Sequence, residues 1–344
     1  MMKIIGKRML AVFGLVFLVI IVVIVMKKDN IVTTKSLFAM DTYMELTAYG
    51  RNSEEAIAEA EKEIYRLDAL LSTGNEISEV AILNRNKKGK LSEDYTYLLK
   101  RSKEIYGMTQ GAFDITIYPL MQAWGFTEKE YRVPDAAEIE KLVSCIDTSE
   151  IVYDESTCIV ELPEKMQLDF GGIAKGYTSS RVAHIMKEYG VKSAMLNLGG
   201  NVQTVGTKVD GSMWRVAIKS PYDDIPYLGV VSIEEKAVIT SGNYERYFEK
   251  DGVRYHHIID PKTGMPVQNG LVSVTIVCED GTLADGLSTA LFVQGKEGAI
   301  EFWKTHSEVF DMILCDENRK LYVTEGIKER FSTELAYEII VKEE

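Results

Sequence analysis

The sequence is short of positive charge and of cysteine. Its 344 residues include 39 Lys and Arg against 52 Asp and Glu, a formal net charge of -13. Nucleic-acid binding rests on clustered cationic side chains, so this balance argues against a nucleic-acid partner. The four cysteines, Cys145, Cys158, Cys278 and Cys315, include no Cys-x-x-Cys pair. Their spacing therefore argues against a structural zinc site.

Three of the cysteines, Cys158, Cys278 and Cys315, lie in apolar runs typical of strands. Free cysteine is among the most buried residue types, so we predict that these three are small core residues. An oxidising compartment would permit one disulfide. The chain also lacks internal repeats, low-complexity tracts and long linkers. With 46% hydrophobic residues it is long enough to bury a core, which predicts one compact unit of one or two lobes.

The N-terminus differs from the rest of the chain. Residues 1–30 hold five Lys and Arg against one Asp, a net charge of +4, which leaves -17 for the remainder. All 18 residues from Met9 to Met26 are apolar or Gly, and at about 1.5 Å per residue they would span a bilayer core. We predict a basic cytoplasmic stub at residues 1–8, a transmembrane signal-anchor at 9–26, a tether at 27–36 and an extracytoplasmic domain at 37–344.

A cleaved signal peptide and a buried helix are the alternatives to this anchor. A signal peptide ends in small residues of an Ala-x-Ala-like site, whereas Val25 and Met26 lead directly to Lys27. Lys27 and Lys28 partly offset the N-terminal positive charges, which weakens the orientation given by the positive-inside rule. The expected location is the cell membrane, with a single span and the catalytic domain on the extracytoplasmic side.

Hydrophobic periodicity predicts an α+β fold, because strands and helices do not alternate regularly. Residues 37–49 are typical of a strand, and a helix capped by Ser53 follows. Its apolar stripe consists of Ile57, Ala60, Ile64, Leu67 and Leu71. Further strands are expected near 150–154, 158–162, 193–198, 214–219, 229–241, 255–259 and 271–278. Further helices are expected near 92–109, 135–145, 175–189, 282–293 and 296–305.

One candidate site runs from Asp169 through Gly171 and Gly172 to Lys175. The pattern passes from a strand end into a helix, whose N-terminal N–H groups favour an anionic phosphate. The spacing matches neither the Walker A motif nor Gly-x-Gly-x-x-Gly, so an ordinary strand-turn-helix junction is the alternative.

A second candidate site is formed by Asp285 and Thr289, which lie four residues apart and so share one helix face. One carboxylate and one hydroxyl suit Mg²⁺, which keeps positions for water and phosphate oxygens. The alternative is a solvated Asp beside a Thr that bonds back to its own helix.

A third candidate is the pair His256 and His257, two of only four histidines, at a strand end. Neighbouring strand residues face opposite sides, so at most one enters a given site, where it could act as a general base. His184 and His306 are isolated and are expected to have packing or surface roles. The turn Gly111 to Thr116 either holds a flat heterocycle or fills the core.

Taken together, these segments resemble the ApbE family of FAD:protein FMN transferases. The matching segments occur in family order across roughly residues 37 to 305. They are Phe38 to Thr42, Leu67 to Ser72 with Ser78 to Asn84, Gly111 to Asp114, Leu168 to Tyr177, Asn197 to Asn201, Thr240 to Arg246, His257 to Pro261 with Thr263 and Gly264, and Ala284 to Thr289.

The resemblance implies an ApbE-like mixed sheet and helix domain that transfers FMN from FAD to a Thr or Ser hydroxyl of an acceptor protein and releases AMP. It implies Mg²⁺ bound by Asp285, Thr289 and the carbonyl of Gly172, with His257 as the base. The positions that match the FAD site are Met40, Ala112, Phe113, Asp114, Asp169, Lys175 and Ile259. The expected partners are FAD, the membrane, and a redox flavoprotein of the membrane or surface that carries the Ser/Thr motif.

One position departs from the family pattern. Many members have an aromatic residue where this chain has Gly74, in a loop expected near FAD. The departure leaves open a FAD pyrophosphatase that yields FMN and AMP. A surface protein that only binds FAD is a separate alternative. The chain contains no Asp-x-Ser/Thr-Gly-Ala-Ser/Thr stretch of the type such enzymes modify, so we do not expect it to be its own substrate.

Overall fold

The computed structural model describes residues 31–342. The predicted stub at 1–8 and anchor at 9–26 lie outside these residues. Within residues 31–342, no helix is both long and apolar enough to cross a membrane. The first strand, β1 (Val32–Ala39), begins inside the segment that we assigned to the tether, so the folded body starts before residue 37.

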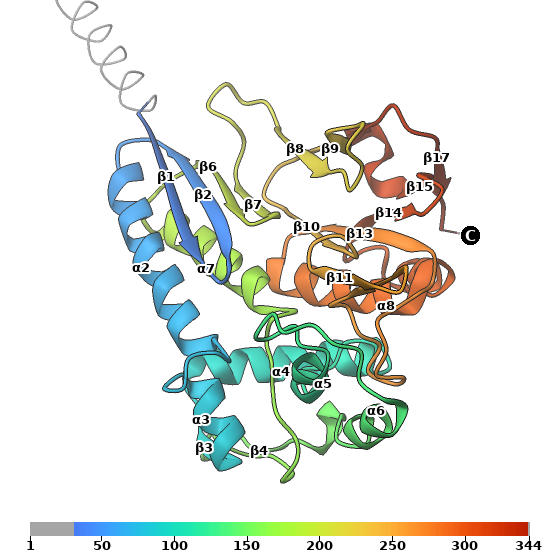
Figure 1. The fold of residues 1–344 in the computed structure, drawn as a ribbon. Coiled ribbons are helices and arrows are strands. Elements are labelled where there is room, and N and C mark those ends of the chain that lie inside the picture. The colour runs from blue at the N-terminus through green and yellow to red at the C-terminus, as the bar shows by residue number, and fades with distance from the viewer. Residues whose placement is uncertain (1–30, 343–344) are drawn as a thin grey trace, which may run out of the picture.

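A mixed nine-stranded sheet forms the centre of the molecule, in the order β1-β2-β6-β7-β10-β13-β14-β15-β17 (Figure 1). Every residue of β13 (Leu271–Cys278) is buried, as expected for a strand covered on both faces. The other strands are β2 (Thr42–Tyr49), β6 (Ser193–Leu198), β7 (Asn201–Val205), β10 (Ala237–Gly242), β14 (Asp311–Asp316), β15 (Leu321–Thr324) and β17 (Tyr337–Ile340).

Three helices cover one face of this sheet, namely α2 (Ser53–Leu71), α7 (Ala174–Glu188) and α8 (Gly281–His306). The predicted stripe of α2 is buried along its length. Its first part, from Ile57 to Ile64, packs against β1, β2 and β6, whereas Leu67 and Leu71 pack in the cluster that includes α3 and α4. Part of the opposite face is covered by a small sheet of β8 (Trp214–Lys219), β9 (Tyr227–Ile233) and β16 (Phe331–Ser332). The α+β prediction is therefore confirmed.

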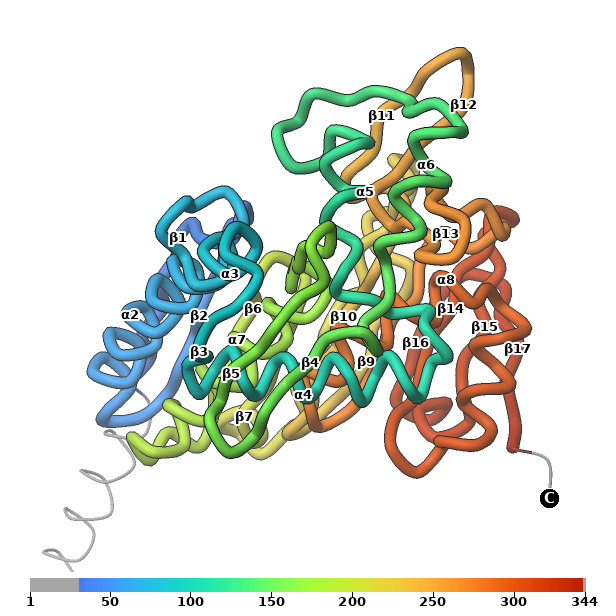
Figure 2. Tube along the Cα trace, turned by 90° about the horizontal axis from the view of Figure 1, so that it is seen from below, coloured from blue at the N-terminus to red at the C-terminus, as the bar shows by residue number. Residues whose placement is uncertain are grey.

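The remaining elements form a lobe beside α8 and a projecting hairpin (Figure 2). The lobe contains α3 (Glu79–Asn86), α4 (Glu93–Met108), α5 (Tyr118–Ala123), α6 (Ala136–Val143), η1 (Thr148–Glu150) and a sheet of β3 (Lys88–Lys90), β5 (Ile159–Glu161) and β4 (Val152–Asp154). The hairpin is β11 (Tyr247–Lys250) and β12 (Val253–His256), and η2 (Glu325–Arg330) lies near the C-terminus. Tyr131 stacks on Phe248 at 5.2 Å between ring centroids, which joins the lobe to the hairpin.

Several local predictions need correction. Residues 37–49 form parts of two strands, because Met40 and Asp41 adopt positive φ angles of 50° and 60° and turn the chain back on itself. Ser53 is the first residue of α2 and not its cap, since its hydroxyl contacts Thr33 Oγ1 at 2.6 Å. The predicted break between two helices is confirmed, because Gly295 has non-helical angles within α8.

The cysteines follow the prediction at two positions of three. Cys278 and Cys315 are buried, whereas Cys158 is partly exposed. Cys158 has a φ angle of 56° and ends a turn before β5, which explains why an apolar run did not place it in the core. All four cysteines lie within the described residues and all are free.

Candidate active site

The floor of the candidate site lies where α7 crosses α8, and Asp285 is its central residue. Asp280 caps α8 by accepting hydrogen bonds from Thr282 N and Leu283 N, which fixes the first turn of the helix. Asp285, one turn later, is 5% exposed, and its Oδ2 accepts a 2.8 Å hydrogen bond from the Gly176 N–H. Burial raises the pKa of Asp285, while the Lys175 ammonium opposes this shift.

Glycine at position 176 permits this helix crossing. A Cβ there would lie 2.2 Å from the Gly281 carbonyl oxygen and 2.5 Å from Asp285 Cβ. No side chain fits without moving one helix away from the other. The Gly176 N–H can reach Asp285 only because the two backbones approach so closely.

The hydroxyl of Thr289 completes the floor on the same face of α8. It lies 3.3 Å from Ser241 Oγ on β10, and Ser241 Oγ lies 2.7 Å from Ser288 Oγ. A Cβ added to Gly172 would lie 3.7 Å from Thr289 Oγ1 and 3.1 Å from the Phe113 ring. We call Gly172, Gly176, Ser241, Asp285 and Thr289 the floor.

Asp169 and Lys175 flank the floor at the start of α7. Asp169 Oδ1 accepts a 2.7 Å hydrogen bond from the Gly171 N–H. Burial raises the pKa of Asp169, against the opposing effects of that hydrogen bond, of Arg246 and of Lys175. The positive charge of Lys175 lowers the pKa of Asp169, of His257 and of Asp285 alike.

Two N–H groups that the sequence suggested for a phosphate are occupied by protein carboxylates. Gly171 N–H donates to Asp169, and Gly176 N–H donates to Asp285. The N-terminus of α7 therefore positions two acidic side chains. This arrangement leaves Lys175 as the positive group that α7 brings to the site.

The structure separates the two neighbouring histidines. His256 is 1% exposed, and its Nε2 contacts the Val267 carbonyl oxygen at 2.7 Å while its Nδ1 accepts from the Ile258 N–H. These contacts use both ring nitrogens, so His256 has a packing role. His257 lies on the other side of the strand end, beside Phe126 and Arg246.

Backbone contacts assign His257 the tautomer of a base. Its Nδ1 lies 3.2 Å from the Arg246 carbonyl oxygen, which also accepts the His257 N–H at 3.0 Å. An Nδ1–H that donates to this carbonyl leaves the lone pair on Nε2. Burial, Arg246 and Lys175 lower the pKa of His257 to about 3, so the ring is neutral at physiological pH.

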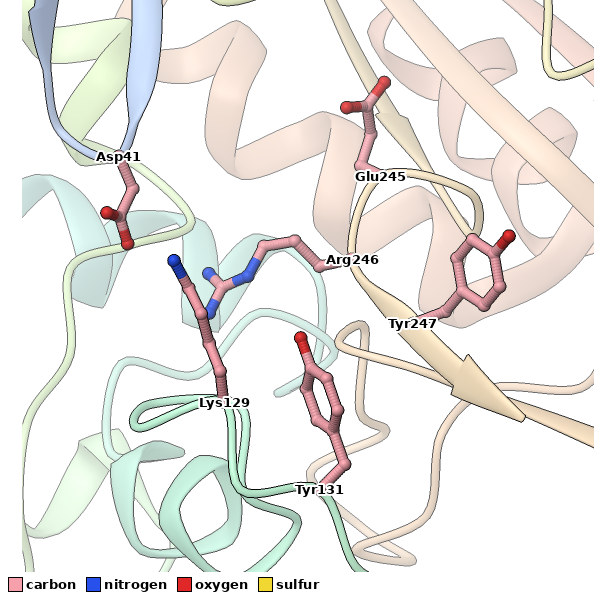
Figure 3. Close-up of a pocket in the computed structure, with 6 residues that line it drawn as sticks. All are labelled: Asp41, Lys129, Tyr131, Glu245, Arg246 and Tyr247. Atoms are coloured by element: carbon pink, nitrogen blue, oxygen red, sulfur yellow. The ribbon is translucent and has the colours of Figure 1, made fainter. Parts of the chain in front are cut away.

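The mouth of the site is a pocket of about 200 Å³ that is lined in part by Arg246, the residue whose carbonyl contacts His257. Its residues come from three segments far apart in the sequence, the β1–β2 turn, the loop after α5, and the start of β11 (Figure 3). The guanidinium of Arg246 donates to the Phe126 carbonyl oxygen at 2.5 Å, which ties two of these segments together. We call the following set the mouth: Asp41, Lys129, Tyr131, Glu245, Arg246 and Tyr247.

The other predicted FAD-site residues have different surroundings in the structure. Phe113 packs against Gly172, with Ala112 buried beside it in the core. Thr178 Oγ1 of α7 donates to Met40 Sδ at 3.6 Å, which places Met40 between α7 and the mouth. Ile259 is buried in a separate apolar cluster with Leu120, Met121 and Trp124.

Asp114 is buried and already fully engaged by protein groups. Its Oδ1 accepts from Thr116 N and from the hydroxyls of Thr116 and Thr148, and its Oδ2 accepts from Thr148 N. These bonds hold the Phe113 turn against η1. Asp114 therefore shapes the wall of the site, and a direct contact with FAD stays a prediction.

The floor suits a small hard cation. Within residues 31–342 no group of three or more His, Cys, Asp and Glu side chains could hold a metal. The floor instead offers one buried carboxylate, one hydroxyl and a main-chain turn at Gly172, which is the sparse oxygen set that Mg²⁺ accepts. A cation here would stabilise the ionised form of Asp285.

Our sequence reasoning did not assign site roles to Ser241, Arg246 and Lys129. Ser241 and Arg246 occur in the motif from Thr240 to Arg246, so their residue types could have been considered. Lys129 lies in an irregular loop with no pattern, and only the folded chain brings it to the mouth.

Comparisons with known proteins agree with this geometry. The model of the ApbE family matches residues 40–314. A FAD:protein FMN transferase of Klebsiella pneumoniae is 34% identical over 320 residues, covering 91% of this chain and 98% of that protein. The ApbE protein of Thermotoga maritima superposes with a TM-score of 0.82 at 31% identity, covering 87% of this chain and 99% of that one. The flavin transferase ApbE of Vibrio cholerae gives a TM-score of 0.77 at 27% identity, with the same coverage.

Proposed function

The chain belongs to the ApbE family, and we propose from this premise how it transfers FMN from FAD to an acceptor protein. In our proposal the acceptor group is a Ser or Thr hydroxyl, the leaving group is AMP, and Mg²⁺ is required. The observation that carries the proposal is the neutral His257, whose ring is oriented by the Arg246 carbonyl.

The reaction needs a base because a hydroxyl is a poor nucleophile at neutral pH. His257 Nε2 accepts the proton of the acceptor hydroxyl, whose oxygen forms a bond to the phosphorus of the FMN half. The bond from that phosphorus to the AMP oxygen breaks, and AMP leaves with its electron pair. Because burial, Arg246 and Lys175 lower the pKa of His257, its ring is neutral at physiological pH and its Nε2 can accept a proton.

Positive charge must balance the pyrophosphate while this bond breaks. Lys175 supplies one charge from the first turn of α7. We propose that Asp285, Thr289 and the Gly172 carbonyl hold Mg²⁺, which supplies additional charge to the phosphate oxygens when bound. Asp169, Phe113 and Met40 are proposed to contact FAD around this centre.

A direct test uses the full-length chain with FAD, Mg²⁺ and a panel of candidate acceptor domains. We expect an increase in the mass of one acceptor by one FMN group, lost when EDTA is added or when the acceptor Ser or Thr is replaced by Ala. If no acceptor increases in mass and free FMN and AMP are released, the enzyme hydrolyses FAD and does not transfer FMN. Tight FAD binding without any turnover would leave only a binding protein.

Hydrolysis is a second candidate function because of Gly74. A Cβ at Gly74 would meet only Ser72 Oγ, at 3.9 Å, so the backbone there accepts a side chain without a collision at Cβ. The adjacent Thr73 forms a hydrogen bond with Tyr118. Burial and the negative charge of Asp169 raise the pKa of Tyr118. We expect G74Y to raise the ratio of transferred to hydrolysed FMN, measured by mass spectrometry and chromatography of one reaction.

We also propose that residues 9–26 anchor the enzyme in the cell membrane with its catalytic domain outside. The support is the uninterrupted apolar run between positively charged flanks. The intact chain should be found in the membrane fraction. Protease added to intact cells should digest its catalytic domain. Digestion only after cell lysis would show that the domain lies on the cytoplasmic side. A shortened chain in the soluble fraction would show that the N-terminal segment is cleaved.

A further inference from the structure

We propose that one face of the β1–β2 hairpin is the docking surface for the acceptor protein. The proposal rests on the transfer activity and adds where the acceptor binds. The face consists of Thr34, Ser36, Phe38, Tyr43, Glu45 and Thr47, which alternate with the buried residues of the two strands and pair across them in register. We call these six residues the hairpin face.

Two exposed aromatic side chains lie at the tip of the hairpin face. Tyr43 is 80% exposed and Phe38 is 52% exposed, and their rings meet edge to face at 5.0 Å. Alternate residues of the same strands, such as Leu37 and Met44, are buried against the helical layer. An exposed aromatic pair contributes little to the folded domain, whereas aromatic residues are enriched in the cores of protein interfaces.

The hairpin face is also poor in charge. Glu45 is its single charged residue, in a chain of which 26% of the residues are charged. Lys35 lies on the opposite side of β1, where it pairs with Glu61 of α2 at 2.9 Å. Depletion of charge together with exposed aromatic rings is the composition of an interface core, and it is unusual for a freely solvated strand pair.

The tip of the hairpin is held in a strained and fixed position. Met40 and Asp41 both adopt left-handed backbone angles, which non-glycine residues rarely do in two-residue hairpins. Thr178 contacts Met40, and Thr42 packs so closely on Gly199 that a Cβ there would lie 2.0 Å from Thr42 Oγ1. These contacts hold the tip over the site.

The hairpin face leads directly into the mouth. Asp41, between the two aromatic residues, points toward Lys129 and Arg246 across the mouth (Figure 3). The carbonyl of the same Arg246 holds His257. The hairpin tip therefore borders the pocket whose Arg246 orients His257, and this continuity with the site selects the acceptor protein as the occupant.

The test compares the full-length F38S/Y43S variant with wild type, using an acceptor domain to which the wild type transfers FMN. We expect the Kd for the unmodifiable Ser/Thr→Ala form of that acceptor to increase at least tenfold, and the KM for the unmodified acceptor to rise similarly. The Kd for FAD and the melting temperature should not change, and Y43F should retain wild-type affinity.

The matched control is Y337S, because Tyr337 is 55% exposed on β17 at the other edge of the sheet. It should leave acceptor binding unchanged. Unaltered acceptor affinity in F38S/Y43S would overturn the proposal. A loss of FAD affinity would overturn it as well, because the two aromatic rings would then belong to the FAD site together with Met40. A failure of the proposed function differs from a failure of the docking proposal, because the wild type would then transfer FMN to no acceptor.

Discussion

The floor and the mouth of the active site are constructed differently. The floor is made where two long helices and β10 pack in the core, and its carboxylate is buried and bonded to the backbone. The mouth is made by a hairpin tip, a loop and a strand start, and Lys129, Tyr131 and Arg246 are exposed there. The rigid floor suits the bond-breaking chemistry, while the exposed mouth suits recognition of a large partner. Substitutions can test this division.

The largest effect is expected from Asp285→Ala in the floor. Removal of its single carboxylate should abolish Mg²⁺-dependent transfer, a loss of at least about 10³-fold, because the charge on the pyrophosphate is no longer balanced. The initial rate of FMN incorporation across a Mg²⁺ titration measures this. D285N is the matched variant, since its amide oxygen can still accept the Gly176 N–H. Retained Mg²⁺ dependence in both variants would contradict the ligand assignment.

The next effect is expected from His257→Asn, between floor and mouth. Loss of the base should lower the transfer rate by about 10²- to 10⁴-fold while FAD still binds. The exposed His184, which pairs with Glu188 on α7, provides a control, and H184N should transfer normally. Single-turnover rates with saturating acceptor separate the chemical step from binding. A rate for H257N within a few fold of wild type would assign the base elsewhere.

The depressed pKa of His257 also predicts a pH dependence. The folded chain keeps the ring neutral down to about pH 3, whereas the unfolded chain protonates it near its ordinary pKa of 6.5. Unfolding therefore takes up a proton below pH 6.5, and the free energy of unfolding falls as the pH decreases from 6.5 toward 3. In H257N this fall should be shallower, as measured by urea unfolding at several pH values. An identical slope would mean that the pKa of His257 is the same in the folded and the unfolded protein.

A smaller effect, on stability, is expected from Gly176→Ala. The added Cβ would collide with Gly281 and Asp285, so α7 and α8 must separate. Overpacking of this kind costs about 1–3 kcal/mol of unfolding free energy, and transfer should decrease as well. G107A is the control, because Gly107 lies inside α4 with no atom within 4 Å of a Cβ, and Ala should stabilise that helix slightly. Equal stability of the two variants would show that the crossing is not tight.

The smallest effect is expected from Arg246→Met in the mouth. The Arg246 carbonyl remains to orient His257, so we expect about a tenfold loss of the transfer rate or less. The loss of its positive charge should raise the pKa of His257 and move the acidic limb of the rate profile toward neutral pH. R254M, on the adjacent β12, should leave that limb in place. An unchanged limb in R246M would show that the guanidinium does not act on His257.

The local sequence pattern predicted the structure correctly where a feature lies within a single helix or strand. The stripe on α2 is buried as its spacing predicts. Asp285 and Thr289 share one face of α8, because residues four apart on a helix lie on the same face. His256 and His257 have different partners, because neighbouring residues of a strand face opposite sides. The break at Gly295 likewise followed from residue type. In each case the relevant distance is a few residues, which dihedral geometry fixes.

Local pattern was misleading where a distant contact decides the outcome. Residues 37–49 were predicted as one strand because the segment is rich in β-branched and aromatic residues. The turn exists because Thr178 and Gly199, far along the chain, hold it. At the glycine-rich start of α7, the local pattern also did not predict that the Gly171 and Gly176 N–H groups bind Asp169 and Asp285.

The sequence by itself determined the fold class, the family and the residue types that carry the chemistry, because helical and strand periodicity and ordered motifs are local properties of the chain. The tertiary structure decided which of those residues meet. It placed the Arg246 carbonyl on His257, brought Gly176 to Asp285, and assembled the mouth from three distant segments. Such contacts depend on how closely two backbones can pack, and that is settled only when the elements are folded together.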